Sequence, residues 1–189
     1  RDLHSFPTRR SSDLEKLLLV SPATVIPYLA IGAFAGLRGA ELARLDWKAV
    51  NLERRIIELR ADQAKTASRR IVPISDNLAA WLEPLARDGK VLTAPTVPRM
   101  ASLLAGKMGL KWPVNVLRHS YISYRLAAIQ DANRVALEAG NSPAIIFKHY
   151  RELVTEEAAG KWFSINPPDG WVPPQKVRGR SLPTTRRRK

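Results

Sequence analysis

Four short segments of this 189-residue chain carry side chains suited to chemistry on an anion. Two segments hold an arginine, Arg38 or Arg118, whose planar guanidinium group can donate two hydrogen bonds to a phosphate. A third holds Lys65, and the last ends on Tyr150, a residue type that can serve as a nucleophile. The segments are Gly36-Leu-Arg-Gly-Ala-Glu-Leu42, Lys65-Thr-Ala-Ser-Arg-Arg-Ile-Val-Pro-Ile74, Asn115-Val-Leu-Arg-His-Ser-Tyr121 and Ala139-Gly-Asn-Ser-Pro-Ala-Ile-Ile-Phe-Lys-His-Tyr150.

Each segment also has an ordinary interpretation when it is taken alone. Arg38 and Glu41 are three residues apart, so they can pair on a helix, and most such pairs are surface ion pairs. Most lysines on polar turns, such as Lys65, are simply exposed, and a tyrosine near a helix end is unremarkable. The chemistry is therefore indicated by the order and spacing of the four segments together.

Composition excludes several other kinds of site. The chain has no cysteine, which rules out disulfides, cysteine-based zinc sites and a thiol nucleophile. Its three histidines, at positions 4, 119 and 149, make a histidine-rich metal site unexpected. The formal net charge is +14, and residues 15–163 alone contribute +7 of it. This excess favours a polyanionic partner, although a basic domain can also be merely soluble.

The elements that must position these residues are mostly helices. A helix is expected from Ser21-Pro22 to Gly36, because serine is a good cap and proline suits the first turn. β-Branched residues predict strands at 50–53, 55–60 and 69–74, with a hairpin turn around Lys65. The other expected helices lie at about 38–45, 76–85, 99–108, 117–129, 131–139, 143–150 and 155–163. This order predicts a mainly helical α+β domain with a small three-stranded antiparallel sheet.

The two ends of the chain look different from the domain at 15–163. Residues 1–14 have no helical or strand period and resemble a translated sequencing adapter, so we expect a non-native segment there. Residues 164–189 are rich in proline and arginine and are expected to form a disordered basic tail. No apolar run is long enough for a membrane span and no signal peptide is evident, so a cytoplasmic location is expected.

Taken together, the four segments resemble the signature of the tyrosine recombinases, the phage integrase family. The family pattern is G-L-R-x-x-E-L, then a hairpin lysine followed by Val-Pro, then H-x-x-R-H-[ST], then G-[HW] with a tyrosine nine residues on. Arg38, Lys65, Arg118 and Tyr150 match it in order, and the resemblance covers about residues 21–163.

The resemblance implies site-specific DNA recombination with Tyr150 as the nucleophile. Arg38 and Arg118 would hold the scissile phosphate, Lys65 would protonate the leaving 5′-oxygen, and the product would be a 3′-phosphotyrosine. Glu41 would support Arg38, and His119 would be structural or lie behind the site. No cofactor or metal is implied. Fixed cations suit this chemistry because they meet the negative charge that develops on the phosphate.

Two positions depart from the family pattern. Asn115 stands where the family has histidine, and Asn141 stands where it has histidine or tryptophan. Asparagine can donate a hydrogen bond to a phosphate oxygen but cannot shuttle a proton near neutral pH. We therefore expect a weakened acid–base system. His149 is next to Tyr150, but neighbouring residues on a helix point about 100° apart.

Three alternatives remain open at this point. The chain can be a catalytically inactive DNA-binding remnant of an integrase, a type IB topoisomerase, which shares this chemistry, or a generic basic helical regulator. The integrase resemblance further implies double-stranded DNA as partner, a homotetramer on paired sites, and an N-terminal core-binding domain that is missing from this sequence. Residues 155–163, with Trp162 and Phe163, are expected to dock either on a neighbouring subunit or within the chain.

Overall fold

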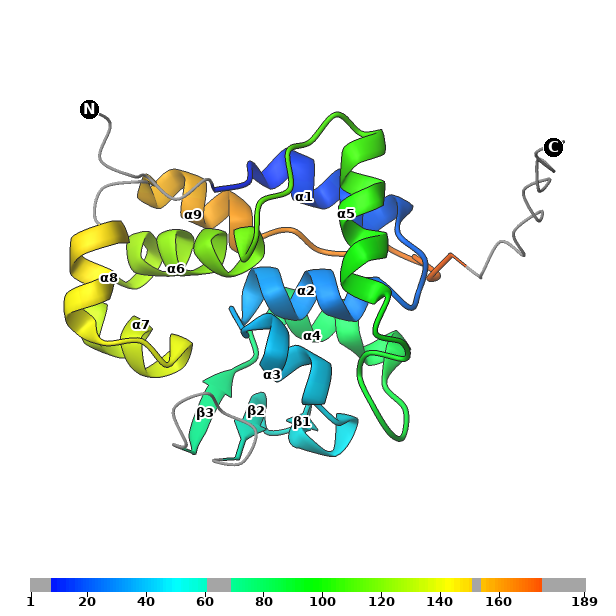
Figure 1. Cartoon of the computed structure of the whole chain (residues 1–189), viewed down its shortest axis with the longest axis horizontal. Helices are drawn as coiled ribbons and strands as arrows, with labels where there is room; N and C mark the ends of the chain where they lie inside the picture. The colour runs from blue at the N-terminus through cyan, green and yellow to red at the C-terminus, as the bar shows by residue number, and fades with distance from the viewer. Residues whose placement is uncertain (1–7, 61–68, 151–153, 175–189) are drawn as a thin grey trace, which may run out of the picture.

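The computed structural model describes residues 8–60, 69–150 and 154–174, and there the chain runs from helices through a small sheet to helices (Figure 1). The predicted mainly helical α+β fold is confirmed. The helices are α1 (Ser11–Val20), α2 (Ile26–Phe34), α3 (Gly39–Arg44), α4 (Asp76–Leu82), α5 (Val97–Lys107), α6 (Val116–Ile129), α7 (Ala132–Ala139), α8 (Pro143–Tyr150) and α9 (Glu156–Phe163). The strands are β1 (Val50–Asn51), β2 (Ile56–Leu59) and β3 (Arg70–Pro73).

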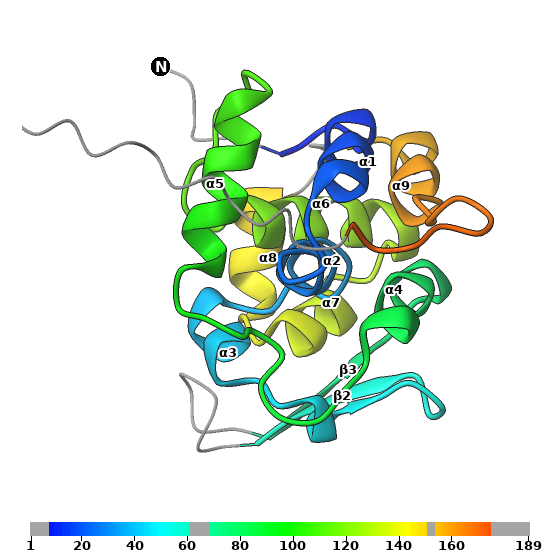
Figure 2. The ribbon, with the colours of Figure 1, turned by 90° about the vertical axis from the view of Figure 1, so that its right-hand side faces the viewer.

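Helix α2 is the centre of the core. Its sequence is apolar on all sides, which is typical of a helix that is buried all round, and eight of its nine residues are buried. Viewed end-on in Figure 2, it is surrounded by other helices, and it contacts α1, α3, α4, α5 and α6. None of the helices in the described residues is long and apolar enough to cross a membrane.

The sheet has the predicted antiparallel order β1-β2-β3. Ile57 pairs with Val50 on one side and with Val72 on the other, and all three side chains are buried. Strand side chains alternate between the two faces of a sheet. Arg70 therefore shares the buried face of Val72. Lys65, which was predicted to lie on the hairpin turn, is outside the described residues.

The first two helices begin at other positions than the sequence predicted. Helix α1 begins at Ser11, before the expected start of the domain at residue 15, and the hydroxyl of Tyr124 donates to the carbonyl of Arg9 (2.7 Å). The non-native origin of residues 1–14 stays a prediction. Ser21 does not start a helix. Its hydroxyl donates to the carbonyl of Leu17 (2.6 Å) and so closes the end of α1, while α2 starts only at Ile26.

The tail that was expected to be disordered begins with residues 164–174, which pack against the domain, and its remainder lies outside the described residues. The carbonyl of Ile165 accepts a hydrogen bond from the indole Nε1 of Trp81 (2.9 Å), and Trp171 packs edge-on against Trp81 with ring centroids 4.9 Å apart. The many prolines of this segment do not prevent it from packing, because the ring of Trp171 and the aliphatic side chain of Ile165 give it apolar area to bury.

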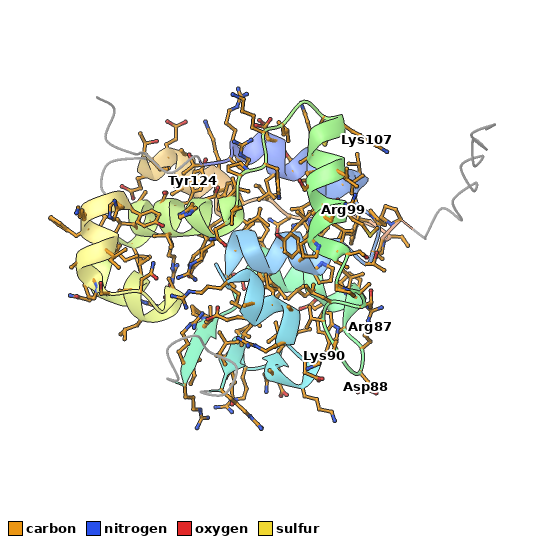
Figure 3. The ribbon with its side chains drawn as sticks, in the orientation of Figure 1. Arg87, Asp88, Lys90, Arg99, Lys107 and Tyr124 are labelled. Atoms are coloured by element: carbon orange, nitrogen blue, oxygen red, sulfur yellow. The ribbon has the colours of Figure 1, made fainter. Side chains whose placement is uncertain are left out.

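Helix α9 packs within its own chain. Trp162 is fully buried, and its Nε1 donates to the carbonyl of Ala33 on α2 (3.0 Å). Its ring stacks on that of Tyr124, which is labelled on α6 in Figure 3. Thr155 caps the helix as predicted, since its hydroxyl accepts from the backbone N–H of Ala158 (3.2 Å). The structure thus shows docking within the chain.

The packing of Trp171 can be tested by unfolding. We expect Trp171→Ala to lower the free energy of unfolding by about 2 kcal/mol, because a half-buried aromatic contact with Trp81 is lost. The matched control Val172→Ala removes an exposed side chain and should change it by less than about 0.5 kcal/mol. Urea denaturation followed by fluorescence measures both. Equal stability of the two variants would contradict the packing of this segment.

Candidate active site

Arg38 is placed by the turn between α2 and α3. Gly36 has a φ of +64°, and a Cβ at this position would collide with the ring of Tyr121, so glycine is required here. The chain then enters α3, where the Glu41 carboxylate accepts from the backbone N–H of Arg38 (2.8 Å). The same carboxylate pairs with the Arg38 guanidinium (3.1 Å), as the sequence predicted.

Arg118 reaches the same place from the first turn of α6. It is 6% exposed, and its Nη1 donates to the carbonyl of Gly36 (2.6 Å). Burial lowers the pKa of the Arg118 guanidinium to about 10, and the nearby positive charge of Arg38 adds to this effect. The group still keeps its charge at neutral pH, so it can hold an anion.

The last turn of α7 binds three guanidinium groups through its main chain. The carbonyl of Glu138 accepts from Nε of Arg70 (3.2 Å), that of Ala139 accepts from Arg118 (2.6 Å), and that of Gly140 accepts from Arg38. A helix cannot satisfy its last carbonyls internally, and they carry partial negative charge. The C-terminus of α7 is therefore a binding site for cations, built from backbone atoms.

Asn141 links the two predicted phosphate-binding arginines. Its Oδ1 accepts from Nη2 of Arg38 (3.0 Å) and from Nη2 of Arg118 (3.1 Å). Gly140, just before it, has a φ of +66°, and a Cβ there would lie 2.9 Å from Nη1 of Arg70. Glycine at 140 thus allows Arg70 and Arg38 to approach the helix end, and Asn141 bridges Arg38 and Arg118 through a single oxygen atom.

The main partner of Glu41 is Arg70, a residue to which the sequence analysis gave no role. The Arg70 guanidinium meets the carboxylate through two hydrogen bonds of 2.7 and 2.8 Å, and both side chains are buried. Burial alone would raise the pKa of the Glu41 carboxyl, but the hydrogen bonds from Arg70 and Arg38 outweigh it and the pKa is lowered. Strand alternation with buried Val72 was the available signal for Arg70.

Tyr150 lies at the end of α8, next to His119 rather than at the surface. Its hydroxyl is 2.6 Å from Nδ1 of His119, and the side chain is 4% exposed. Burial raises the pKa of the Tyr150 hydroxyl, while the positive charge of Arg118 acts in the opposite direction. Tyr150 and Arg118 therefore lie within electrostatic reach of each other.

The structure describes one of the two remaining predicted site residues, Asn115, and not the other, Lys65. Asn115 is the residue before α6, with a φ of +59°, and its exposed side chain lines a cavity of about 320 Å³ that Arg118 also lines. We call Arg38, Arg70 and Arg118 the arginine cluster. Asn115 thus lies at the edge of this cluster rather than inside it. Lys65 lies outside the described residues.

A second charge cluster, centred on buried Glu138, joins α7 to α6. The sequence analysis did not predict it. The carboxylate of Glu138 accepts from Arg125 (two bonds of 2.9 Å), from the Tyr121 hydroxyl (2.8 Å) and from Arg134 (3.3 Å). Only Arg134 and Glu138 have a helical spacing that a sequence can reveal. This cluster fixes α7 against α6.

Comparison with known proteins agrees with this geometry. The model of the "Phage integrase family" matches residues 28–136, more than half of the chain; the match includes Arg38 and Arg118 but stops before Asn141 and Tyr150. No curated protein matches.

Two solved structures share the fold. One is the crystal structure of XerA recombinase (TM-score 0.68, 21% identity), which aligns with 86% of this chain and 65% of its own. The other is an integrase from mycobacterium phage Brujita (TM-score 0.60, 17% identity), with 87% and 60% covered. This chain thus spans less than two thirds of the length of either protein. The matched family model and the arginine cluster that lies within it lead to one conclusion: the chain belongs to the phage integrase family.

Proposed function

We propose that this chain is the catalytic domain of a tyrosine-type site-specific DNA recombinase. It would cleave and rejoin double-stranded DNA through a 3′-phosphotyrosine intermediate on Tyr150. The observation that carries the proposal is the meeting of Arg38 and Arg118 on the end of α7 and on Oδ1 of Asn141. XerA recombinase and the Brujita integrase, which share the fold, are named for related activities.

The charge balance of the arginine cluster favours an anionic substrate. Arg38, Arg70 and Arg118 bring three positive charges, and Glu41 supplies one negative charge. The C-terminus of α7 contributes about half a negative charge. Roughly 1.5 positive charges therefore remain to be balanced, which suits a phosphodiester that gains negative charge in its transition state.

In the proposed reaction, Arg38 and Arg118 hold the non-bridging oxygens of the scissile phosphate. The Tyr150 oxygen attacks phosphorus, the bond to the 5′-oxygen breaks, and Lys65 supplies a proton to that oxygen. Because the tyrosyl ester conserves the bond energy, a free 5′-hydroxyl can reverse the step on the same strand or a new one. Asn115, at the edge of the cluster, would donate a hydrogen bond to the phosphate.

The wider assembly is also part of the proposal. Exposed basic side chains such as Arg99 and Lys107 on α5 (Figure 3) would contact phosphates away from the cleavage point, so binding should weaken steeply with salt. The complete enzyme would act as a homotetramer on paired DNA sites, in the cytoplasm of a bacterial or phage-infected cell.

The arginine cluster can be tested through its stability. We expect Glu41→Gln to lower the free energy of unfolding at pH 7 by about 3 kcal/mol, because Arg38 and Arg70 lose their buried counter-charge. The pKa of Glu41 is lowered, so its contribution is present above the ordinary carboxyl pKa of about 4.3. As the pH falls through the lowered value, wild type and variant should converge.

Urea denaturation at several pH values measures this difference. Glu157→Gln is the matched control, because Glu157 pairs with Lys161 at the surface and should leave the unfolding midpoint unchanged. A constant difference between wild type and Glu41→Gln at all pH values would contradict the assignment of Glu41 as the charged partner.

The reaction itself can be tested with a nicked suicide substrate, in which the cleaved 5′ fragment diffuses away and traps the covalent complex. We expect the purified chain to form a protein–DNA adduct that requires no metal ion and is abolished in Tyr150→Phe. Denaturing gel electrophoresis detects the adduct. Arg118→Lys should reduce the rate of adduct formation by about 10²-fold or more, because lysine cannot make the bidentate contact of a planar guanidinium group with the phosphate.

The outcomes separate the candidate functions. DNA binding without any Tyr150-dependent adduct would instead indicate an inactive DNA-binding remnant. Relaxation of supercoiled DNA without sequence preference would indicate a topoisomerase. An adduct that survives in Tyr150→Phe would show that another residue is the nucleophile.

A further inference from the structure

His119 and Tyr150 form a contact that the proposed reaction has not yet used. Nδ1 of His119 and the hydroxyl oxygen of Tyr150 are 2.6 Å apart, a short hydrogen bond for this pair of atoms. The two rings are nearly parallel, at 23° with centroids 5.9 Å apart. The family pattern gives His119 a position after the second arginine and no chemical role.

The packing of α6, α7 and α8 fixes this contact. Tyr150 belongs to a small apolar cluster that is separate from the main core and is formed by residues of these three helices: Tyr121, Ile122, Val135, Ala136, Ala139, Ile146 and Tyr150. His119 precedes this cluster on α6 and follows Arg118 directly. The same helix therefore presents one residue to the phosphate site and the next one to the hydroxyl.

We propose that His119 accepts the phenolic proton of Tyr150 when this residue attacks the DNA. The inference rests on the proposed function and names the base of that reaction. The Tyr150 oxygen forms a bond to phosphorus as its proton moves to Nδ1 of His119. The bond from phosphorus to the 5′-oxygen breaks, and that oxygen takes a separate proton, assigned above to Lys65. Rejoining returns the proton from His119 to Tyr150.

The surroundings of His119 keep it ready to take a proton. Burial lowers the pKa of its imidazole, and the positive charge of Arg118 lowers it further, so the neutral form dominates at pH 7. On α7 the charge of Glu138 is matched by Arg125 (2.9 Å), and from α8 the hydroxyl of Tyr150 contacts His119. The same Arg118 charge favours the phenolate that the transfer leaves behind.

This assignment accounts for the asparagine at position 115. An amide cannot accept a proton near neutral pH, and Asn115 is exposed at the edge of the cluster. His119 supplies an imidazole from the other end of the same helical turn. A recombinase with Asn115 can thus keep a base for its nucleophile.

The first test compares DNA substrates with an ordinary and a sulfur-substituted leaving group. A 5′-phosphorothiolate leaves as a thiolate, whose conjugate acid has a pKa near 8.5, so it needs no proton donor. We expect His119→Gln, which can still hydrogen-bond Tyr150, to slow single-turnover cleavage by about 10²-fold on both substrates. Lys65→Ala should be slow on the ordinary substrate alone. His149→Gln is the matched control and should cleave both at the wild-type rate.

The pH profile gives a readout that a structural role would not change. Wild-type cleavage should rise with pH as His119 loses its proton, and this inflection should disappear in His119→Gln. Wild-type rates in His119→Gln would overturn the proposal. So would recovery on the sulfur substrate, which would place His119 on the leaving-group side.

A second test does not depend on activity. The chain has three histidines, so NMR can follow the imidazole of His119 directly. A hydrogen bond from Tyr150 stabilises neutral His119, so Tyr150→Phe should raise its titration midpoint by about half to one pH unit. An unchanged midpoint would overturn the proposal. If wild type forms no adduct but the midpoint shifts, the proposed function fails while the pairing of His119 with Tyr150 stands.

Discussion

Three guanidinium groups from distant parts of the chain meet at the last turn of α7. Arg38 comes from the turn after the central helix, Arg70 from the sheet, and Arg118 from the start of α6, and successive carbonyls of residues 138–140 accept from them. Like charges so close together repel, so the arrangement depends on negative charge placed among them. Buried Glu41 and the end of a helix dipole supply it, and both are part of the folded chain itself.

This arrangement ties the proposed catalysis to the stability of the fold. The glycine turn at Gly36, the capping carboxylate of Glu41 and the inward-facing Arg70 each satisfy a local structural need and also orient a guanidinium group. Transition-state stabilisation works best with dipoles and charges that need no rearrangement. Tyr150, the proposed nucleophile, is held differently, by a small apolar cluster and a contact with His119, so the two halves of the proposed site belong to separate packing units.

Much of this could be predicted from the sequence. Periodicity located the sheet and the helices from α3 onward, and motif order located Arg38, Glu41, Arg118 and Asn141, which the structure brings together. Local signals misled at Ser21, whose hydroxyl closes the preceding helix, and at Trp171, where proline content concealed an aromatic contact. Three pairings could not be found, because the two residues lie 13 or more positions apart in different elements: Glu41 with Arg70, Tyr150 with His119 and Glu138 with Arg125.

The arginines are bound at the end of α7 by the main-chain carbonyls of residues 138–140, and this has an evolutionary consequence. Carbonyl oxygens are common to all residue types, so substitutions along the exposed face of α7 leave the arginine acceptors in place. A single inserted or deleted residue within the helix would instead turn its end by about 100° and direct the carbonyls away from Arg38, Arg70 and Arg118. Homologues should therefore vary freely in the residues on that face of α7 while keeping its length unchanged.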